Sequence, residues 1–200
     1  MRLETEPKAI LALDIETTPR WWWYDGKATN RVMMFVGQWV DSRMGPFGWI
    51  FTPKVILEGL TDSRSREYQG LPMVSREQGL RMVSLTIADA DSLLGHNVRD
   101  FDLPSLDGEL MIANMPMLPR RTVLDTLRDT ERTAGQSRSL GNRLARLPET
   151  VDKPHVEPVV WERAFHDFEP AALREVWERS TADVQGHIDL FVNDREKGYL

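Results

Sequence analysis

The stretch that decides the fold is AILALDIETT, residues 9–18. Its first five residues are apolar, so we expect a short buried strand over 9–14. Side chains alternate between the two faces of a strand, which predicts that Asp14 and Glu16 point the same way. Two carboxylates at the end of a buried strand are costly unless something compensates them. A divalent cation that prefers oxygen ligands would do so; the alternative is a strand end that runs into solvent, with both acids hydrated.

The rest of the chain alternates between strand-like and helix-like patterns. Apolar runs typical of strands occupy residues 32–40, 46–51, 92–95 and 122–124, and residues 41–45 have the composition of a hairpin turn. Helical patterns begin at a capping box of Ser75 and Gln78 and continue at 101–113, 140–147, 161–165 and 170–193. Residues 54–72 indicate an irregular surface segment. This order predicts an α/β fold: a mixed five-stranded sheet, with the first strand central, flanked by helices.

Composition narrows the function classes. The chain has 200 residues, which fits a single domain over 1–200. Cysteine is absent, which excludes a disulfide framework, a thiolate zinc site and a cysteine nucleophile. The net charge of -6 argues against a protein that coats nucleic acid by bulk attraction, but acidic metal sites leave a nuclease open. No apolar run approaches the ~20 residues of a bilayer helix, so we expect a cytoplasmic protein with no membrane partner.

Two further groups of acids accompany the first pair. The segment LGHNVRDFDLP, residues 94–104, places acids directly after a second buried strand. Asp183 lies in the last predicted helix, on the flank of an apolar stripe, about 80–100° from its centre. The stripe is formed by Leu173, Trp177, Val184 and Phe191, with Ser180 among them. From there a carboxylate can reach the edge of a sheet that the helix covers; taken alone, Asp183 also fits an ordinary solvated aspartate.

Together these motifs resemble the DEDD (DnaQ-like) superfamily of 3′–5′ exonucleases, in particular the proofreading exonuclease domain of family B DNA polymerases. Residues 14–17, DIET, match the first motif, and residues 97–106, NVRDFDLPSL, match the second, Asn-x-x-x-Phe-Asp-x-Pro-x-Leu. Asp183 and Val184, with Leu190 and Phe191, match the third. The resemblance covers residues 8–192 and implies an RNase H-like fold.

The resemblance also implies the chemistry. It assigns Asp14, Glu16, Asp102 and Asp183 as ligands of two divalent cations, Mg²⁺ or Mn²⁺, in a two-metal phosphodiesterase. The expected activity is 3′–5′ hydrolysis of single-stranded ends, DNA in the first place and RNA as the alternative. A DNA polymerase or another replication protein is the expected partner, in a bacterium or a bacteriophage. Thr17, Asn97 and Phe101 are carried over as contacts to nucleic acid.

The third motif departs from the family. A tyrosine four residues before the aspartate, or a histidine five before, is replaced here by Arg179 and Glu178. Arginine stays protonated and cannot accept a proton, but from one helical turn away it could contact the scissile phosphate. His187, one turn beyond Asp183, is the other candidate helper, and His166 in a predicted loop is a third. Three hypotheses remain: a cation alone generates the nucleophile, another side chain helps to activate the water, or the protein is a catalytically weakened module that binds nucleic acid or accompanies a polymerase.

An aromatic tract follows the first motif. Residues 21–24 are WWWY, and Trp21 and Trp22 are our candidates for stacking on terminal bases. The alternative is that the tract plugs a core or forms a protein interface.

Overall fold

The structure is a computed structural model that describes residues 9–18, 23–24, 27–28, 31–60, 68–129, 139–147 and 155–198. Within these ranges the strands are β1 (Ile10–Thr17), β2 (Trp23–Tyr24), β3 (Lys27–Ala28), β4 (Val32–Trp39), β5 (Phe47–Thr52), β6 (Met73–Ser75), β7 (Ser92–Gly95) and β8 (Thr122–Asp125). The helices are α1 (Lys54–Gly59), α2 (Arg76–Asp89), α3 (Asp102–Ile112), α4 (Leu140–Leu144), α5 (Pro158–Phe165) and α6 (Pro170–Glu196). None of the described helices combines the length and the apolar character that crossing a bilayer requires.

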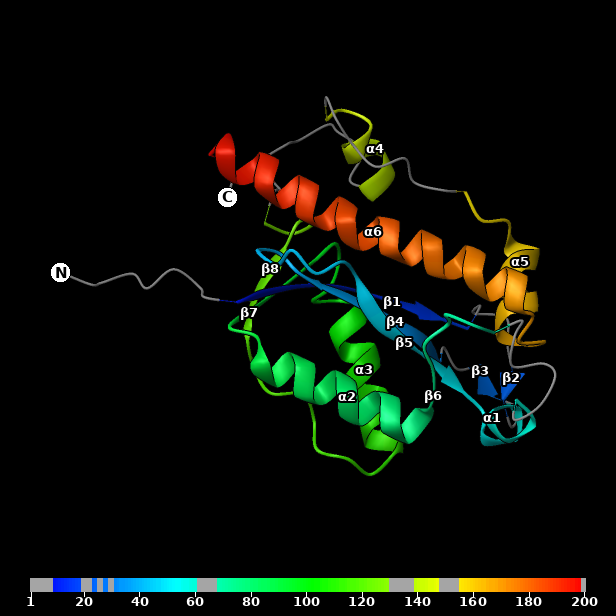
Figure 1. Ribbon diagram of the computed structural model, residues 1–200. Helices are drawn as coiled ribbons and strands as arrows, with labels where there is room; N and C mark the ends of the chain where they lie inside the picture. The colour runs from blue at the N-terminus through cyan, green and yellow to red at the C-terminus, as the bar shows by residue number, and fades with distance from the viewer. Residues whose placement is uncertain are drawn as a thin grey trace.

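The described part of the chain forms one six-stranded sheet in the order β6-β5-β4-β1-β7-β8, and β2 pairs separately with β3. Strand β1 pairs antiparallel with β4 and parallel with β7, so the sheet is mixed and its first strand is central (Figure 1). Both features were predicted. The predicted count of five strands was wrong, because β6 adds a sixth strand parallel to β5 at the sheet edge. Three residues are too few to show a period of two in the sequence.

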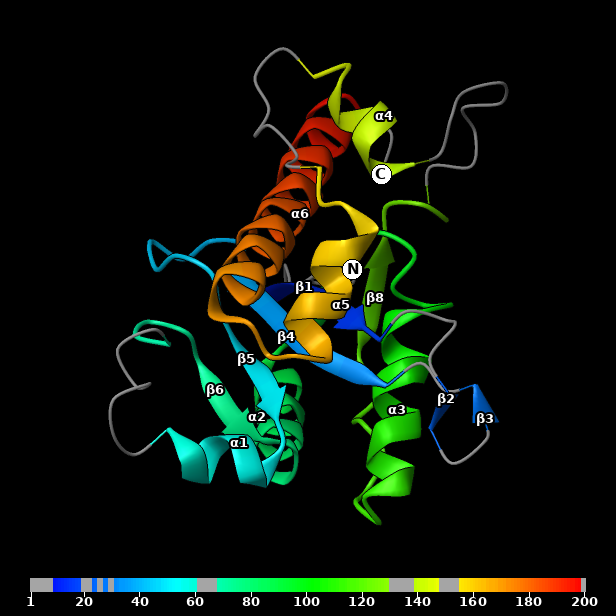
Figure 2. The same ribbon diagram turned by 90° about the vertical axis from the view of Figure 1, so that its right-hand side faces the viewer.

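Helices cover both faces of the sheet, as Figures 1 and 2 show. Alternate residues of β1 feed two separate cores. Ile10 and Ala12 pack with residues of β4, α5 and α6, whereas Leu11 and Leu13 pack with residues of α2 and α3. Asp14 and Glu16 continue the series of Ile10 and Ala12, so their side chains leave β1 on the face that α6 covers.

The structure refines the predicted boundaries. Residues 54–60, expected to be irregular, contain helix α1. The predicted capping box is half formed: the Ser75 hydroxyl accepts a hydrogen bond from the Gln78 backbone N–H at 3.3 Å and begins α2. The last helix extends past the predicted Asn193 to Glu196, giving a continuous helix of 27 residues.

Candidate metal centre

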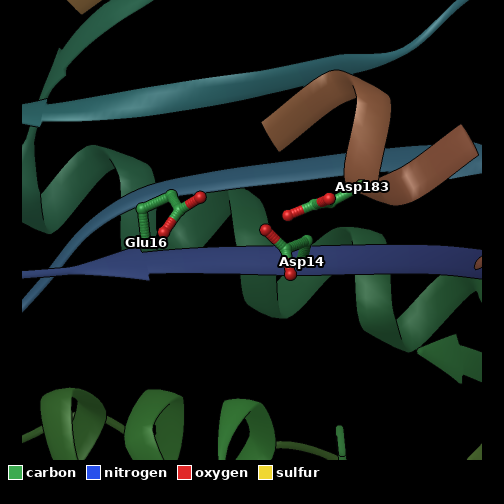
Figure 3. Close-up of side chains that lie close together, drawn as sticks. All are labelled: Asp14, Glu16 and Asp183. Atoms are coloured by element: carbon green, nitrogen blue, oxygen red, sulfur yellow. The ribbon is translucent and has the colours of Figure 1, made fainter. Parts of the chain in front are cut away.

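Three carboxylates meet over β1. Asp14 and Glu16 come from the strand and Asp183 comes from α6, and their ligand oxygens all lie within 4.8 Å of one another. Figure 3 shows Asp14 and Glu16 on the same strand with Asp183 on the helix beside them. Asp183 lies 167 positions after Glu16 and 169 after Asp14 in the sequence, so only the packing of α6 on β1 brings the three together.

Helix α6 places Asp183 by burying the residues around it. Val176 and Val184 belong to the core shared with Ile10 and Ala12 of β1, and both are fully buried. Asp183 follows that surface and is itself only 5% exposed. The interpretation of Asp183 as a solvated aspartate is therefore wrong, and its position on the flank of the apolar stripe is what turns it toward the sheet.

Asp102 approaches from the other side of β1. It is the first residue of α3 and is buried. Its Oδ1 accepts a hydrogen bond from the Ile15 backbone N–H at 3.1 Å, between the two acids of the strand. Among the described residues it does not belong to the group whose oxygens lie within 4.8 Å, although its charge contributes to raising the pKa of Glu16.

The electrostatics of the cluster disfavour negative charge. Burial raises the pKa of Glu16 to about 8, and the charges of Asp183 and Asp102 add to the effect, while a hydrogen bond from Ser180 and the Arg179 charge oppose it. Burial likewise raises the pKa of Asp102 to about 7; the Ile15 N–H opposes the shift and the Asp125 charge adds to it. A nearby cation would reverse this balance, because it stabilises the ionised form of each acid.

Two residues of α6 hold the carboxylates in place. The Ser180 hydroxyl lies 2.8 Å from Oε1 of Glu16 and 3.1 Å from the Val176 carbonyl oxygen. The Arg179 Nε donates to Oδ2 of Asp183 at 3.0 Å. Sequence reasoning missed the role of Ser180, and the signal that could have found it is a hydroxyl inside an otherwise apolar stripe, because a buried hydroxyl needs a polar partner.

The histidines lie in different surroundings. His187 is only 2% exposed, and its ring stacks on that of His96 with centroids 6.4 Å apart. His96 in turn shares a hydrogen bond of 2.9 Å between its Nδ1 and the Thr126 hydroxyl. His166 follows α5 on the surface, with Nδ1 2.6 Å from Oδ1 of Asp167. Buried packing thus accounts for His187, whose role as a helper remains a prediction.

The loop before Asp102 is organised by Asp125, which is fully buried at the end of β8. Its two oxygens each lie 3.0 Å from a backbone nitrogen of this loop: Oδ1 accepts from Asn97 and Oδ2 from Arg99. Asn97 adopts a left-handed φ of 71°, which asparagine tolerates better than most residues. Phe101, half-buried, packs against the core on the α2–α3 face. Backbone conformation and packing therefore explain both residue types without a ligand, and their contacts to nucleic acid remain predictions.

The remaining predicted contacts are placed only in part. Thr17 ends β1 at a register shift between Glu16 and Thr17. Trp21 and Trp22 lie outside the described residues, so the structure does not bear on the stacking prediction.

The residues present fit a divalent cation. Their donor set is made of carboxylate oxygens, which Mg²⁺ and Mn²⁺ prefer, and the raised pKa values of the acids mark a place where positive charge would be stabilising.

Comparison with known proteins places the fold. No protein-family model matches the chain, and no curated protein matches it in sequence. Among solved structures it is similar to the structure of the family B DNA polymerase from the hyperthermophilic archaeon Pyrobaculum calidifontis, with a TM-score of 0.64 and 16% sequence identity. The match covers 94% of this chain and 24% of the polymerase chain. The chain therefore has an α/β fold, compatible with the RNase H-like fold and shared with part of a family B DNA polymerase.

Proposed function

We propose that this protein is a metal-dependent 3′–5′ exonuclease that hydrolyses the ends of single-stranded DNA. The observation that carries the proposal is the meeting of Asp14, Glu16 and Asp183 over the central strand, with Asp102 anchored to the same strand. The likeness of the fold to part of a DNA polymerase supports a role with nucleic acid and makes a replication protein the expected partner.

In this proposal Asp14, Glu16 and Asp183 bind the catalytic cations, and Asp102 completes the ligand set from α3. The bound cations would acidify the attacking water and neutralise charge on the phosphate and the leaving oxygen. Ser180 orients Glu16 through its hydroxyl. Arg179, already beside Asp183, adds positive charge for the scissile phosphate but accepts no proton.

A second candidate function follows from Arg179. Its guanidinium forms an ion pair with Asp183 and lowers the pKa of Glu16, so it supplies part of the positive charge that a cation would bring. In that alternative the protein is a catalytically weakened module that binds nucleic acid or accompanies a polymerase.

A strand-labelling assay separates these functions. One single-stranded DNA and the RNA of the same sequence are labelled at either end and incubated with Mg²⁺, Mn²⁺ or EDTA. We expect the 5′-labelled DNA to give a ladder of shortened strands, and the 3′-labelled DNA to release labelled mononucleotide at once. Faster cleavage of the RNA would make the protein an exoribonuclease of the same fold.

Matched variants test the site itself. Asp14→Asn and Asp183→Asn should each lower the rate more than about a hundredfold, because a cation contributes several kcal/mol to phosphodiester hydrolysis. Asp189→Asn is the control, since Asp189 lies on the same helix and accepts a hydrogen bond from Gln185 at 2.8 Å instead. If the wild-type protein binds single strands without cleaving them in any metal, the weakened module is the correct function.

A further inference from the structure

A cavity of about 390 Å³ opens beyond the end of β1. It begins at Thr18, two residues after Glu16, and is closed by the ends of β4 and β5, the start of α2 and the segment between α5 and α6. This volume lies in the range of small-ligand pockets. None of the acids of the candidate metal centre lines it, so the cavity and the metal centre are separate features.

One wall of the cavity carries two arginine side chains. Arg31 and Arg76 both line it, and both form ion pairs with one carboxylate, Glu109. The Glu109 side chain is only 3% exposed, whereas the arginine side chains are 24% and 28% exposed. Two guanidinium groups thus share one buried carboxylate, and both arginine side chains stay partly exposed where they line the cavity. Burial lowers the pKa of Arg76; the Glu109 charge opposes this shift and the Arg31 charge adds to it.

Three phenylalanine rings form another part of the lining. Phe51, Phe165 and Phe168 line the cavity, and the guanidinium of Arg76 lies over the Phe51 ring, 5.6 Å from its centroid. Rings of this kind favour a flat, apolar ligand group, because stacking and burial both contribute. Guanidinium groups favour phosphate, which they match in shape and charge. A ligand that satisfies both walls has an aromatic part and a phosphate part.

We propose that this cavity binds a nucleoside 5′-phosphate, independently of the metal centre. The choice of a nucleotide over another aromatic anion rests on the proposed function, because an exonuclease meets such units at each cycle, within the strand and as its product. The cavity takes the base against its phenylalanine rings and the phosphate at Arg76 and Arg31. Binding of the nucleotide in EDTA distinguishes this cavity from the metal centre, where a nucleotide would be bound through the cations.

Calorimetric titration with dAMP in EDTA tests the proposal. We expect saturable binding of dAMP to the wild-type protein, and weaker binding of deoxyadenosine and of inorganic phosphate, each of which fills only one wall. Asp14→Asn should bind dAMP as the wild type does, because Asp14 does not line the cavity. Binding that requires Mn²⁺ and Asp14 would overturn the proposal by assigning the nucleotide to the metal centre.

The decisive variant is Arg76→Met. Glu109 keeps its two hydrogen bonds from the Arg31 guanidinium and the hydrogen bond from the Val32 N–H, so the substitution removes one guanidinium group without isolating a buried carboxylate. We expect dAMP affinity to fall about tenfold, the loss expected for one charge-assisted hydrogen bond. Arg76→Lys keeps the charge and loses the planar group, so its dAMP affinity should lie between those of the wild type and Arg76→Met. Thermal melting of each variant shows whether it is folded.

The matched control is Arg81→Met. Arg81 lies on the same helix and forms a surface ion pair with Glu77, and it does not line the cavity. Its substitution therefore removes one positive charge from the helix without changing the proposed site. Equal losses of dAMP affinity in Arg76→Met and Arg81→Met, or no loss in either, would overturn the proposal.

Competition by an oligothymidylate then identifies the source of the nucleotide. Displacement of dAMP by the oligothymidylate assigns the cavity to a unit of the strand, and continued binding of dAMP assigns the cavity to free mononucleotide. Loss of hydrolysis alone would refute the proposed function and leave dAMP binding in EDTA unchanged.

Discussion

The Ser180 hydroxyl lies 2.8 Å from Oε1 of Glu16, so α6 both completes the carboxylate cluster through Asp183 and holds one of the acids of β1. A carboxylate binds a cation more tightly when it is already oriented in the free protein, because ordering it on binding lowers the affinity. Ser180 meets that need from a position that is itself fully buried.

Ser180→Ala should weaken Mn²⁺ binding about fivefold, because a neutral hydrogen bond contributes about 1 kcal/mol. The loss should be larger at pH 6 than at about pH 9, because Ser180 also lowers the pKa of Glu16. Calorimetric titration with Mn²⁺ measures both. Ser84→Ala on α2, which packs on the opposite face of the sheet, should leave the affinity unchanged, and an equal loss there would argue against a specific role for Ser180.

Without metal, the protein should become less stable as the pH rises from about 5 to about 8. The folded state raises the pKa of Glu16 from 4.5 to about 8, so between these values it binds more protons than the unfolded state, and stability is lost as Glu16 ionises. Melting temperatures in EDTA across this range measure the effect.

Glu16→Gln should remove that contribution, so its melting temperature should gain on that of the wild type as the pH rises. Glu58→Gln is the control, because the Glu58 side chain is 65% exposed on α1. A constant difference between Glu16→Gln and the wild type over the whole range would show that Glu16 does not ionise late. Saturating Mn²⁺ should reverse the wild-type trend, since the cation favours the ionised acids.

Asp102→Asn distinguishes the structural role of Asp102 at the start of α3 from its proposed role as a metal ligand. The amide oxygen can still accept the Ile15 N–H, so the fold should be preserved, while the charge is lost. We expect hydrolysis to fall by about a hundredfold or more, with a melting temperature in EDTA at or above that of the wild type, because the raised pKa of Asp102 reflects a burial cost that the amide lacks. Cleavage at the normal rate would remove Asp102 from the ligand set.

Arg179→Met should tighten Mn²⁺ binding about fivefold and raise the KM for single strands. The substitution removes a positive charge 3.0 Å from Asp183, which a cation must otherwise displace or tolerate. It also removes the group that we assign to the phosphate. Titration with Mn²⁺ and steady-state kinetics follow the two effects, and Arg179→Lys should show less of each. Unchanged Mn²⁺ affinity would contradict the placement of Arg179 at the cluster.

His187→Ala should destabilise the protein by about 2 kcal/mol or more, because it opens a cavity in a buried site. Urea unfolding measures the loss, and His155→Ala, at an exposed position, should stay near zero. The pH–rate profile of a folded His187→Gln variant should keep its shape. If that variant bound Mn²⁺ and DNA normally but did not cleave, His187 would be the proton acceptor.

Local pattern was enough to predict the central strand, the shared face of Asp14 and Glu16, and the helix that carries Asp183, because periods of two and of 3.6 are properties of short segments. It was not enough for contacts that depend on register between distant elements. Glu109 meets Arg31 across 78 residues, and nothing in either segment marks the pair. Strand β6 was not predicted for a different reason: its three residues form a strand only because they pair with the edge strand β5.

Arg179, Ser180 and Asp183 lie on one continuous helix, and Asp14 and Glu16 lie on one continuous strand. Inserting or deleting a single residue between Leu173 and Arg179 would turn all three side chains by about 100° relative to the core that fixes the helix. The same event in β1 before Asp14 would send both acids to the other face of the sheet. Substitutions can therefore be explored one position at a time in these two elements, whereas changes of length are confined to the loops between them.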